Sequence, residues 1–402
     1  MQEYQSETGY GLRACPICEN KSRSVIFRQR FQGIAGAKLF DGYDVVVCRE
    51  CGFGFADAIP EQSVFDSYYR DVSKYEHVDR GGQQPGLDMI RLNALADVVL
   101  KQVPVASHVL DVGCSTGTLL HLLKTRGFPN LTGLDPAPYC KEMAQRLYGI
   151  RVLTGSLSEP PEPQLGYECL ILAAVLEHVR DLTSFLTYLK LWLTHGGFVV
   201  VEVPDAAEFT AGQNAPFQEF SIEHINFFTP LSLNNLMGGH GFRSIYVEQV
   251  VREMAHNVSG AALIAVYQFD AVLRPRNYDT ITEPALRRYI AHCQSAEVHE
   301  ASIFRMLVEM RKPIVVWGVG THAQRLLATT PLGEANITAF VDSNPKYQGK
   351  KLMGRPVLAP HELRGREEAI LISSWTYFDE IQEQIRADLG LTNEIIRIHA
   401  LR

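Results

Sequence analysis

The chain has 402 residues, with 38 Lys or Arg against 45 Asp or Glu, so its net charge is −7. This acidic balance excludes nucleic-acid binding through bulk positive charge. Apolar residues make up 46%, as in ordinary soluble proteins, and the length predicts two or three domains. The longest apolar stretch, Leu170 to Leu176, is much shorter than the roughly 20 residues of a membrane span. The N-terminus lacks the basic start and apolar core of a secretory signal, so we expect a cytosolic protein that binds neither nucleic acid nor membranes.

Four of the eight cysteines form two C-x-x-C pairs, Cys15 with Cys18 and Cys48 with Cys51. Disulfides do not persist in a reducing compartment, and two such pairs a few tens of residues apart are typical of a tetrahedral zinc site. Four thiolates leave no open coordination position, so the predicted Zn²⁺ is structural. A redox C-x-x-C motif is the alternative.

The pattern of apolar residues divides the chain into four segments. Residues 1–86 hold the cysteines and a tyrosine-rich stretch, and residues 271–311 are expected to form a helical linker. Residues 87–270 and 312–402 each alternate strand-like and helix-like runs, which predicts a doubly wound parallel sheet in the first range and a smaller α/β unit in the second. The expected strands are 108–112, 130–134, 167–173, 198–203, 313–317, 337–341 and 369–373, and the expected helices include 87–102, 283–310 and 321–328.

A glycine-rich turn follows the first strand of the middle unit. Gly113 and Gly117 allow a tight turn and a close approach to a ligand, and the helix that opens near Thr118 offers free N–H groups. Some twenty residues later the next strand ends in Asp135, whose carboxylate can accept from both hydroxyls of a ribose. This spacing predicts a nucleoside site.

The D-x-G-x-x-x-G turn and the acidic strand end resemble the class I S-adenosylmethionine-dependent methyltransferases, over roughly residues 87–270. The likeness continues in LILAAVLEHV and GGFVVVEVPD, whereas the G-x-G-x-x-G of a competing dinucleotide site is absent from this turn. It implies S-adenosyl-L-methionine as cofactor. The residues that it implies are Asp111, Gly113 and Gly117 at the methionine end, Asp135 at the ribose, Ser156 and Leu157 near the adenine, and His178 lining the pocket.

Two Glu-His dipeptides are candidates for proton transfer, at residues 177–178 and 223–224. Histidine is a suitable base near neutral pH, and a neighbouring carboxylate can orient it. The second dipeptide lies among phenylalanines, after the last predicted strand of the middle unit, where a loop over the acceptor is expected. We expect His224 and Glu223 to be catalytic; the alternative is that His224 only packs the loop.

The last unit begins with a strand and the turn Gly318-Val-Gly320-Thr-His-Ala323, and Asp342 ends the next strand. Glycines after a strand and a later carboxylate are typical of a nucleotide site. A unit that serves only for packing is the alternative.

Taken together, the four-cysteine module, the donor domain with its E-H-x-x-x-F loop and the Rossmann-like C-terminal unit resemble the nucleotide-sugar C-methyltransferases over nearly the whole chain. The resemblance implies a nucleotide-linked keto-deoxysugar as substrate. A histidine matching His224 removes the proton beside the keto group, and the enolate carbon attacks the donor methyl. Further residues implied by the resemblance are Tyr75 near the sugar, and Gly318, Gly320, His322 and Asp342 facing the acceptor.

One position departs from that family, which often carries a tyrosine two residues before the glutamate, where this chain has Ser221. Methylation of oxygen or nitrogen on a sugar or another metabolite therefore stays open. A metabolite-sensing binding protein is a third hypothesis, against which the intact Gly113, Gly117 and Asp135 argue.

Overall fold

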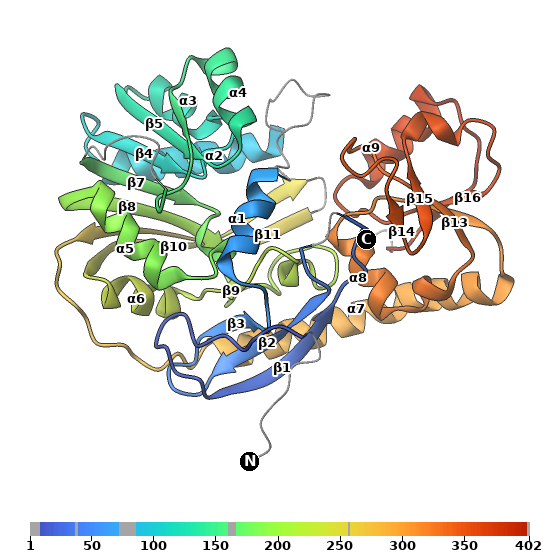
Figure 1. Ribbon diagram of the computed structural model, residues 1–402, viewed down its shortest axis with the longest axis horizontal. Coiled ribbons are helices and arrows are strands. Elements are labelled where there is room, and N and C mark those ends of the chain that lie inside the picture. Colours follow the sequence, from blue (N-terminus) through green and yellow to red (C-terminus); the bar gives the residue numbers. More distant parts are fainter. Residues whose placement is uncertain (1–8, 37–38, 72–85, 160–165, 256–257, 400–402) are drawn as a thin grey trace.

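The computed structural model describes residues 9–36, 39–71, 86–159, 166–255 and 258–399. Its strands form three sheets, of four, seven and six strands. Figure 1 shows the four-stranded sheet below the seven-stranded sheet, with the six-stranded sheet to one side of both. None of the helices in these ranges is long and apolar enough to cross a membrane.

The four-stranded sheet is antiparallel and includes a strand from a distant part of the chain. Its order is β1-β2-β3-β9, and β9 comes from the loop that carries the second Glu-His dipeptide. That loop is therefore anchored on the N-terminal sheet. The elements are β1 (Arg23–Arg30), β2 (Gly42–Cys48), β3 (Gly54–Asp57) and β9 (Asn226–Phe227), and the helix α1 (Gln62–Asp71) follows β3.

The seven-stranded sheet confirms the doubly wound sheet predicted for the middle of the chain. Its order is β10-β11-β8-β7-β4-β5-β6, in which β4 to β8 pair in parallel and an antiparallel hairpin, β10 and β11, extends one edge. Strands buried on both faces carry the uninterrupted apolar runs seen in the sequence. The strands are β4 (His108–Val112), β5 (Asn130–Asp135), β6 (Val152–Thr154), β7 (Tyr167–Ala173), β8 (Leu193–Pro204), β10 (Phe242–Ala255) and β11 (Val258–Phe269).

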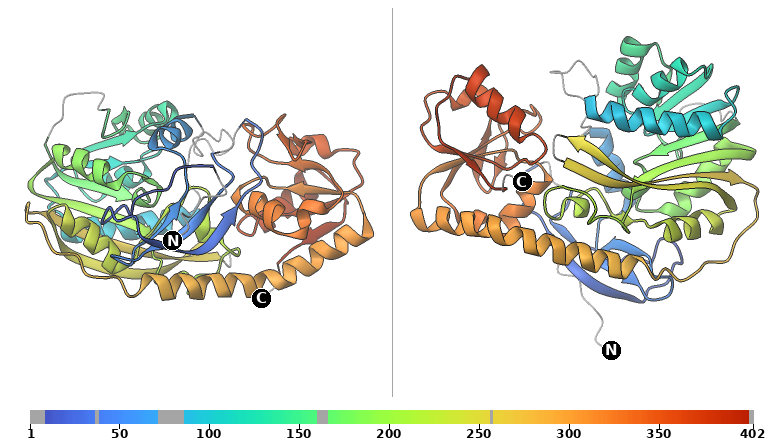
Figure 2. Two further views of the ribbon diagram at one scale, coloured as in Figure 1. Left: turned by 60° about the horizontal axis from the view of Figure 1, so that its bottom comes forward. Right: turned by 180° about the vertical axis from the view of Figure 1, so that it is seen from behind.

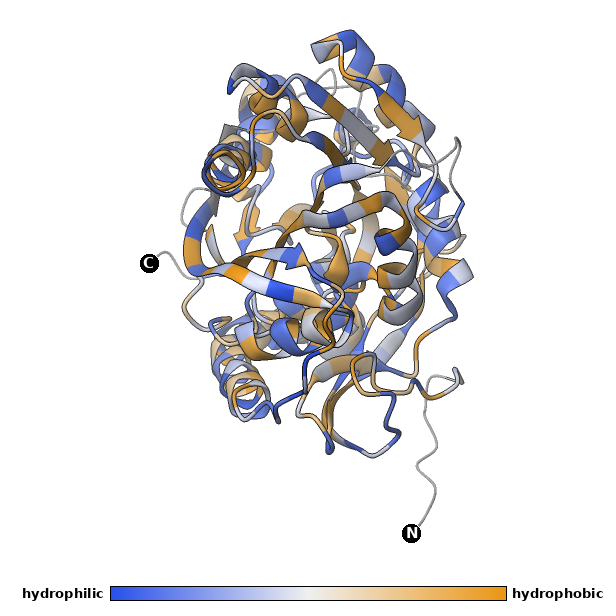
Figure 3. Cartoon of the chain, turned by 90° about the vertical axis from the view of Figure 1, so that its left-hand side faces the viewer, coloured by the Kyte–Doolittle hydropathy of each residue, from blue (hydrophilic) through white to orange (hydrophobic). Residues whose placement is uncertain are grey.

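Helices connect these strands and carry both hydrophobic and hydrophilic residues (Figure 3). The α-helices are α2 (Gly86–Gln102), α3 (Thr118–Thr125), α4 (Pro138–Tyr148), α5 (Leu182–Trp192) and α6 (Pro230–Gly239), and the 3-10 helices are η2 (Leu176–His178) and η3 (Gln218–Phe220).

A 29-residue helix, α7 (Thr282–Met310), runs along the molecule to the C-terminal unit (Figure 2). The six-stranded sheet there has the order β14-β15-β13-β12-β16-β17, with a parallel core and an antiparallel pair at β14 and β15. The elements are β12 (Ile314–Trp317), α8 (Thr321–Thr329), η4 (Pro331–Glu334), β13 (Ile337–Val341), β14 (Lys351–Leu352), β15 (Arg355–Leu358), η5 (Pro360–Leu363), β16 (Ala369–Ile372), α9 (Phe378–Glu383), the π-helix η6 (Gln384–Asp388) and β17 (Ile395–Arg397).

The N-terminal sheet and the central sheet share one hydrophobic core. A single cluster of buried side chains includes Cys15 and Phe55 from the first part of the chain and Leu110 and Val201 from central strands. Burial of apolar area stabilises such a cluster by about 25 cal/mol per Å². The cysteine pairs therefore lie against the central sheet instead of forming a separate core.

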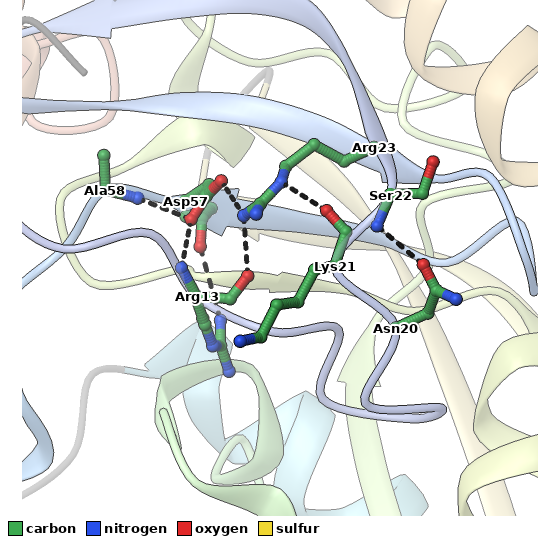
Figure 4. Close-up of polar contacts among 8 residues, drawn as sticks. Arg13, Asn20, Lys21, Ser22, Arg23, Asp57 and Ala58 are labelled. Atoms are coloured by element: carbon green, nitrogen blue, oxygen red, sulfur yellow. Dashed lines mark hydrogen bonds and ion pairs between the residues drawn. The ribbon is translucent and has the colours of Figure 1, made fainter. Parts of the chain in front are cut away.

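Arg13 connects the segment before the first cysteine to the end of β3 through the buried carboxylate of Asp57. Its backbone N–H donates to Asp57 Oδ1 at 2.6 Å, and the guanidinium of Arg23 pairs with the other oxygen of Asp57 (Figure 4). Arg23 also donates to the carbonyl of Arg13 at 2.7 Å. The end of β3 is thereby fixed to the segment that precedes the first cysteine.

The Arg13 guanidinium itself reaches across to the central unit. It donates to the carbonyls of Ala56 (3.4 Å), Ile225 (3.2 Å) and Arg180, and to Asn226 Oδ1 (3.0 Å). Arg13 is only 4% exposed, and burial lowers its pKa to about 9. A charge removed from water in this way requires a full set of acceptors.

We predict that Arg13→Met lowers the free energy of unfolding by about 3 kcal/mol, because several buried acceptors lose their donor. Urea denaturation measures this change. The matched control is Arg28→Met, whose side chain is 52% exposed, and its effect is expected within about 0.5 kcal/mol. Equal losses in both variants would contradict the role of Arg13.

Candidate active site

The residues predicted for the donor site gather at the carboxyl edge of the central sheet. Asp111 lies in β4, the glycine-rich turn follows it, and Asp135 ends β5 beside it. Parallel neighbours end at the same edge, which is where open α/β sheets bind ligands. The structure thus brings these predicted residues together.

The Asp135 carboxylate holds the glycine-rich turn in place. Its Oδ2 accepts from the backbone N–H of Ser115 and its Oδ1 from that of Ala137, both at 2.9 Å. Gly113 and Gly117 have φ angles of +75° and +81°, which favour glycine. Each carboxylate oxygen keeps a second lone pair, so Asp135 can also accept from a ribose hydroxyl.

Asp111 is buried beneath this turn and only 2% exposed. Burial, and then the charge of Asp135, raise its pKa to about 8. Within the described part of the chain, Asp111 Oδ1 and the hydroxyls of Ser115 and Thr116 have no hydrogen-bond partner. Buried polar groups rarely lack hydrogen-bond partners. These three groups fit the charged amino-acid end of S-adenosylmethionine.

Ser156 and Leu157 follow β6 at the same edge. The N–H of Gly155 donates to the carbonyl of Asp135 at 3.1 Å, which holds this segment beside the ribose-binding candidate. Leu157 is buried, and its carbonyl accepts from Trp192 Nε1 at 3.4 Å. The two residues therefore lie close to the end of β5, where an adenine attached to the ribose would extend.

The two Glu-His dipeptides meet face to face, although they lie in separate segments. The N–H of Ile225 donates to the carbonyl of Glu177 at 2.8 Å, and His178 Nδ1 lies 2.9 Å from the carbonyl of Glu223. The ring centroids of His178 and His224 are 5.1 Å apart. Backbone contacts thus hold both histidines in one site.

Asn226 fixes the position of this loop. Its side-chain amide donates to the carbonyls of Leu176 and Val179, each at 2.7 Å, and its oxygen accepts from Arg13. The amide therefore clamps η2, which carries the first dipeptide, to the loop that carries the second. Sequence reasoning did not single out Asn226.

The contact of His178 defines its tautomer. A carbonyl oxygen only accepts, so Nδ1 carries the hydrogen and Nε2 is the acceptor in the neutral ring. Nε2 lies 3.8 Å from Glu177 Oε1. Glu177 is 1% exposed, and burial raises its pKa to about 8, so its carboxyl group retains a proton at neutral pH.

The second dipeptide is organised by two hydroxyl groups. Ser221 Oγ accepts from the N–H groups of Glu223 (3.4 Å) and His224 (3.2 Å), so this serine supports the loop backbone. Tyr68, in α1, donates to Glu223 Oε1 at 3.0 Å. Tyr68 was missed by the sequence analysis; its place in the tyrosine-rich FDSYYR stretch was the available signal. Tyr75 lies outside the described residues.

The turn predicted in the C-terminal unit repeats the arrangement of the donor turn. Asp342 accepts from the N–H of Val319 at 2.9 Å and from that of Asn344 at 2.8 Å. Apart from the two chain neighbours of Gly320, no described residue comes within 4 Å of the position that a Cβ on this glycine would occupy, so the glycine faces open space. Nearby, Tyr347 contributes to the raised pKa of Tyr68, after burial and Glu223. The loop after β13 therefore approaches the second dipeptide.

The four paired cysteines converge on one point. Cys15 Sγ lies 3.5 Å from Cys51 Sγ, Cys18 Sγ lies 3.4 Å from Cys48 Sγ, and all four sulfurs are within 4.8 Å of one another. These separations are too long for disulfides. A tetrahedral zinc site with Zn–S bonds of 2.3 Å places its sulfurs about 3.8 Å apart, so the cluster fits such a metal.

The doubly wound sheet, the glycine-rich turn locked by Asp135 and the orphaned polar groups around Asp111 together define the class of the central unit. It is a class I methyltransferase domain, and the chain is an S-adenosylmethionine-dependent methyltransferase.

Comparisons with known proteins agree with this class. Residues 88–247 match a family model described as a methyltransferase domain, and residues 310–396 match one described as C2185-like, N-terminal. The C-methyltransferase NovU of Streptomyces niveus is 25% identical over 366 residues, which cover 86% of this chain and 83% of that protein. An uncharacterized methyltransferase of Mycobacterium bovis is 32% identical over 122 residues, 29% of this chain and 60% of that protein.

Two solved structures each match less than half of the chain. An S-adenosylmethionine-dependent methyltransferase from Methanosarcina mazei is 14% identical, with a TM-score of 0.37 over 44% of this chain and 98% of that chain. The N-methyltransferase NodS from Bradyrhizobium japonicum is 17% identical, with a TM-score of 0.36 over 46% of this chain and 96% of that chain.

We predict that Glu177→Gln flattens the dependence of stability on pH. The folded pKa of about 8 exceeds the unfolded value of 4.5, so the folded state binds the additional proton between these pH values. The free energy of unfolding then falls as pH rises, by up to about 1.4 kcal/mol per pH unit. Urea denaturation from pH 5 to 9 measures this slope. The exposed Glu142, changed to Gln, is the control, and an unchanged slope in Glu177→Gln would refute the prediction.

Proposed function

We propose that the protein is a C-methyltransferase that acts on a nucleotide-linked keto-deoxysugar, with His224 as the base. The observation that carries this proposal is the meeting of the two Glu-His dipeptides, whose members His178 and Glu223 lie 45 residues apart in sequence. The first dipeptide follows β7 of the central sheet, which also carries the donor turn, and backbone and ring contacts hold the second dipeptide against it. A base beside a methyl donor is the requirement for methylating a carbon acid.

The relative NovU supports the choice of carbon as the methylated atom. That protein is named a C-methyltransferase, and the similarity extends over 86% of this chain, well beyond the donor domain. The N-terminal and C-terminal parts are therefore shared along with the methyltransferase domain.

The proposed reaction has two steps. His224 accepts the proton from the carbon beside the keto group, and the electrons of the broken C–H bond form the enolate. The enolate carbon then forms a bond to the methyl group while the bond from methyl to sulfur breaks. S-adenosyl-L-methionine supplies this electrophilic methyl group and a good leaving group, and S-adenosylhomocysteine is released.

Neighbouring residues would orient the base and the acceptor. Glu223, 5% exposed and bonded to Tyr68, is proposed to position the acceptor beside His224. The protonated Glu177 and the Nε2 of His178 line the donor side of the same site. Buried phenylalanines such as Phe220 and Phe227 would exclude water from the enolate.

The C-terminal unit is proposed to enclose the nucleotide-linked end of the acceptor. The candidates are Gly318, Gly320, His322 and Asp342. Two contacts support this role. Tyr347 approaches Tyr68, and the Arg325 guanidinium lies 4.8 Å from the ring centroid of Phe217, in the loop that carries the second dipeptide.

We predict that the protein exchanges the carbon-bound proton of a keto-sugar nucleotide in heavy water, and that His224→Gln lowers this exchange by about 100-fold or more. Nuclear magnetic resonance and mass spectrometry measure exchange and methyl transfer. The exposed His108, changed to Gln, is the control. Ready methyl transfer without exchange would contradict the enolate mechanism and indicate an oxygen or nitrogen acceptor.

The four-cysteine cluster is proposed to hold a structural Zn²⁺. We predict about one zinc per chain by elemental analysis of freshly purified protein. Cys48→Ser should lose the metal and unfold at lower temperature, since metal binding contributes to folding free energy. The control is Cys169→Ala, a buried cysteine outside the cluster, which should retain zinc. Protein without stoichiometric metal would refute this site.

A further inference from the structure

The C-terminal sheet reverses its strand order at the same point as the donor-binding sheet. In both, the first strand lies between the second strand and a later one: β4 between β5 and β7, and β12 between β13 and β16. Ligands of open α/β sheets bind at the carboxyl ends of the strands at such a reversal. In the C-terminal unit this place lies between the ends of β12 and β16, where Ser373 Oγ donates to the carbonyl of Trp317 at 3.0 Å.

Ring nitrogens of two histidines near this point have no hydrogen-bond partner in the described part of the chain: both nitrogens of His322 and Nδ1 of His399. Nε1 of Trp375 and both carboxyl oxygens of Glu300 also lack a partner at ordinary hydrogen-bond distance, although these two groups face each other. His322 lies in the first turn of α8, Trp375 follows β16, and His399 follows β17. Glu300 comes from α7 and is 2% exposed.

Their mutual influence shows that these groups lie together. The pKa of His322 is well below its usual value because of burial and the nearby Arg325 and His399. Burial raises the pKa of Glu300 to about 7, while the charge of Arg325 and hydrogen bonding by the Trp375 indole lower it. The rings of Trp375 and His399 are 4.8 Å apart, at 38°. We refer to Glu300, His322, Trp375 and His399 as the C-terminal polar cluster.

The cluster carries little charge of its own. Burial lowers the pKa of His399 to about 4, so this histidine is neutral, as is His322. The neighbouring cations are both paired, Arg325 with Glu297 and Arg397 with Asp379, although Arg325 Nε has no hydrogen-bond partner among the described residues. An uncharged ligand with both hydrogen-bond donors and acceptors suits such a site better than a phosphate.

Proteins rarely leave buried polar groups without hydrogen-bond partners. Several such groups at the point where the strand order reverses therefore indicate a ligand site. The indole N–H is a donor, a neutral imidazole is both donor and acceptor, and the two neighbouring aromatic rings offer flat faces for stacking. The edge of a heterocyclic base, where carbonyl oxygens alternate with N–H groups, complements this set.

We propose that the C-terminal polar cluster binds the nucleobase of the nucleotide that carries the acceptor. This inference rests on the proposed nucleotide-linked substrate, and it assigns recognition of the base to residues other than the Gly318–Gly320 turn and Asp342. Selection among nucleotides would then be made in the C-terminal unit, separately from the methyl-transfer chemistry.

Calorimetric titration with UDP, CDP, ADP and GDP tests the proposal, with inorganic pyrophosphate as the base-free probe. We expect the wild-type protein to bind one class of base at least tenfold more tightly than the others. Trp375→Phe and His322→Ala should each weaken this binding about tenfold and reduce the preference. The exposed His361, changed to Ala, is the matched control in the same unit and should bind as wild type does.

Thermal unfolding of the ligand-free variants separates binding from a structural role. Trp375→Phe removes an indole N–H that faces the Glu300 carboxyl group without reaching it at ordinary hydrogen-bond distance, so its melting temperature should change little. A clear fall, with unchanged nucleotide affinity, would show that the cluster serves packing and would overturn the proposal. Binding equal to that of pyrophosphate, or no binding of any diphosphate, would also overturn it.

The outcomes for the two proposals are distinguishable. Selective, cluster-dependent binding of a nucleoside diphosphate without methylation of any keto-sugar nucleotide would support the base site and refute the proposed function. If the protein methylates a keto-sugar nucleotide and this activity is unchanged in Trp375→Phe and His322→Ala, the result would support the proposed function and refute the base site.

Discussion

The buried contact between Arg13 and Asn226 determines where the second Glu-His dipeptide lies. The Arg13 guanidinium donates to the Asn226 side chain, whose amide donates in turn to two carbonyls that flank the first dipeptide. Since water does not reach this network, each lost bond would leave a buried group unsatisfied. The relative position of His178 and His224 therefore depends on a residue near the N-terminus of the chain.

This network also connects the cysteine cluster with the loop that carries the second Glu-His dipeptide. Cys48 ends β2, which pairs with β3, and Phe55 of β3 pairs with Asn226 of β9. A metal held by the four cysteines would stabilise the sheet on which the loop rests, without taking part in the chemistry. In physical terms the N-terminal unit is a support that orders one side of the candidate active site.

The central and C-terminal sheets share one backbone arrangement, at the candidate donor site and at the proposed nucleotide site. In each, a carboxylate at the end of the second strand accepts from the N–H of a residue in the preceding turn: Asp135 from Ser115, and Asp342 from Val319. The two turns differ in the buried polar groups that have no hydrogen-bond partner among the described residues. The donor turn has the Asp111 carboxyl group, whose ionised form suits a cationic ligand, and the C-terminal turn has the neutral His322. The same backbone geometry thus presents different chemistry.

The sequence alone determined the doubly wound middle sheet, the glycine-rich turn with Asp135, and the two cysteine pairs. Strands such as 108–112 and 167–173 lie where they were predicted, because strands buried on both faces leave apolar runs, and the turn depends on neighbours in the chain. Tertiary structure alone decided the insertion of β9 into the N-terminal sheet, the meeting of His178 with the Glu223 carbonyl, and the bond from Tyr68 to Glu223. These contacts join residues that are far apart in the sequence. Hydrophobic periodicity and motif spacing depend on near neighbours in the chain, so they do not predict which distant backbone groups a buried side chain will bond.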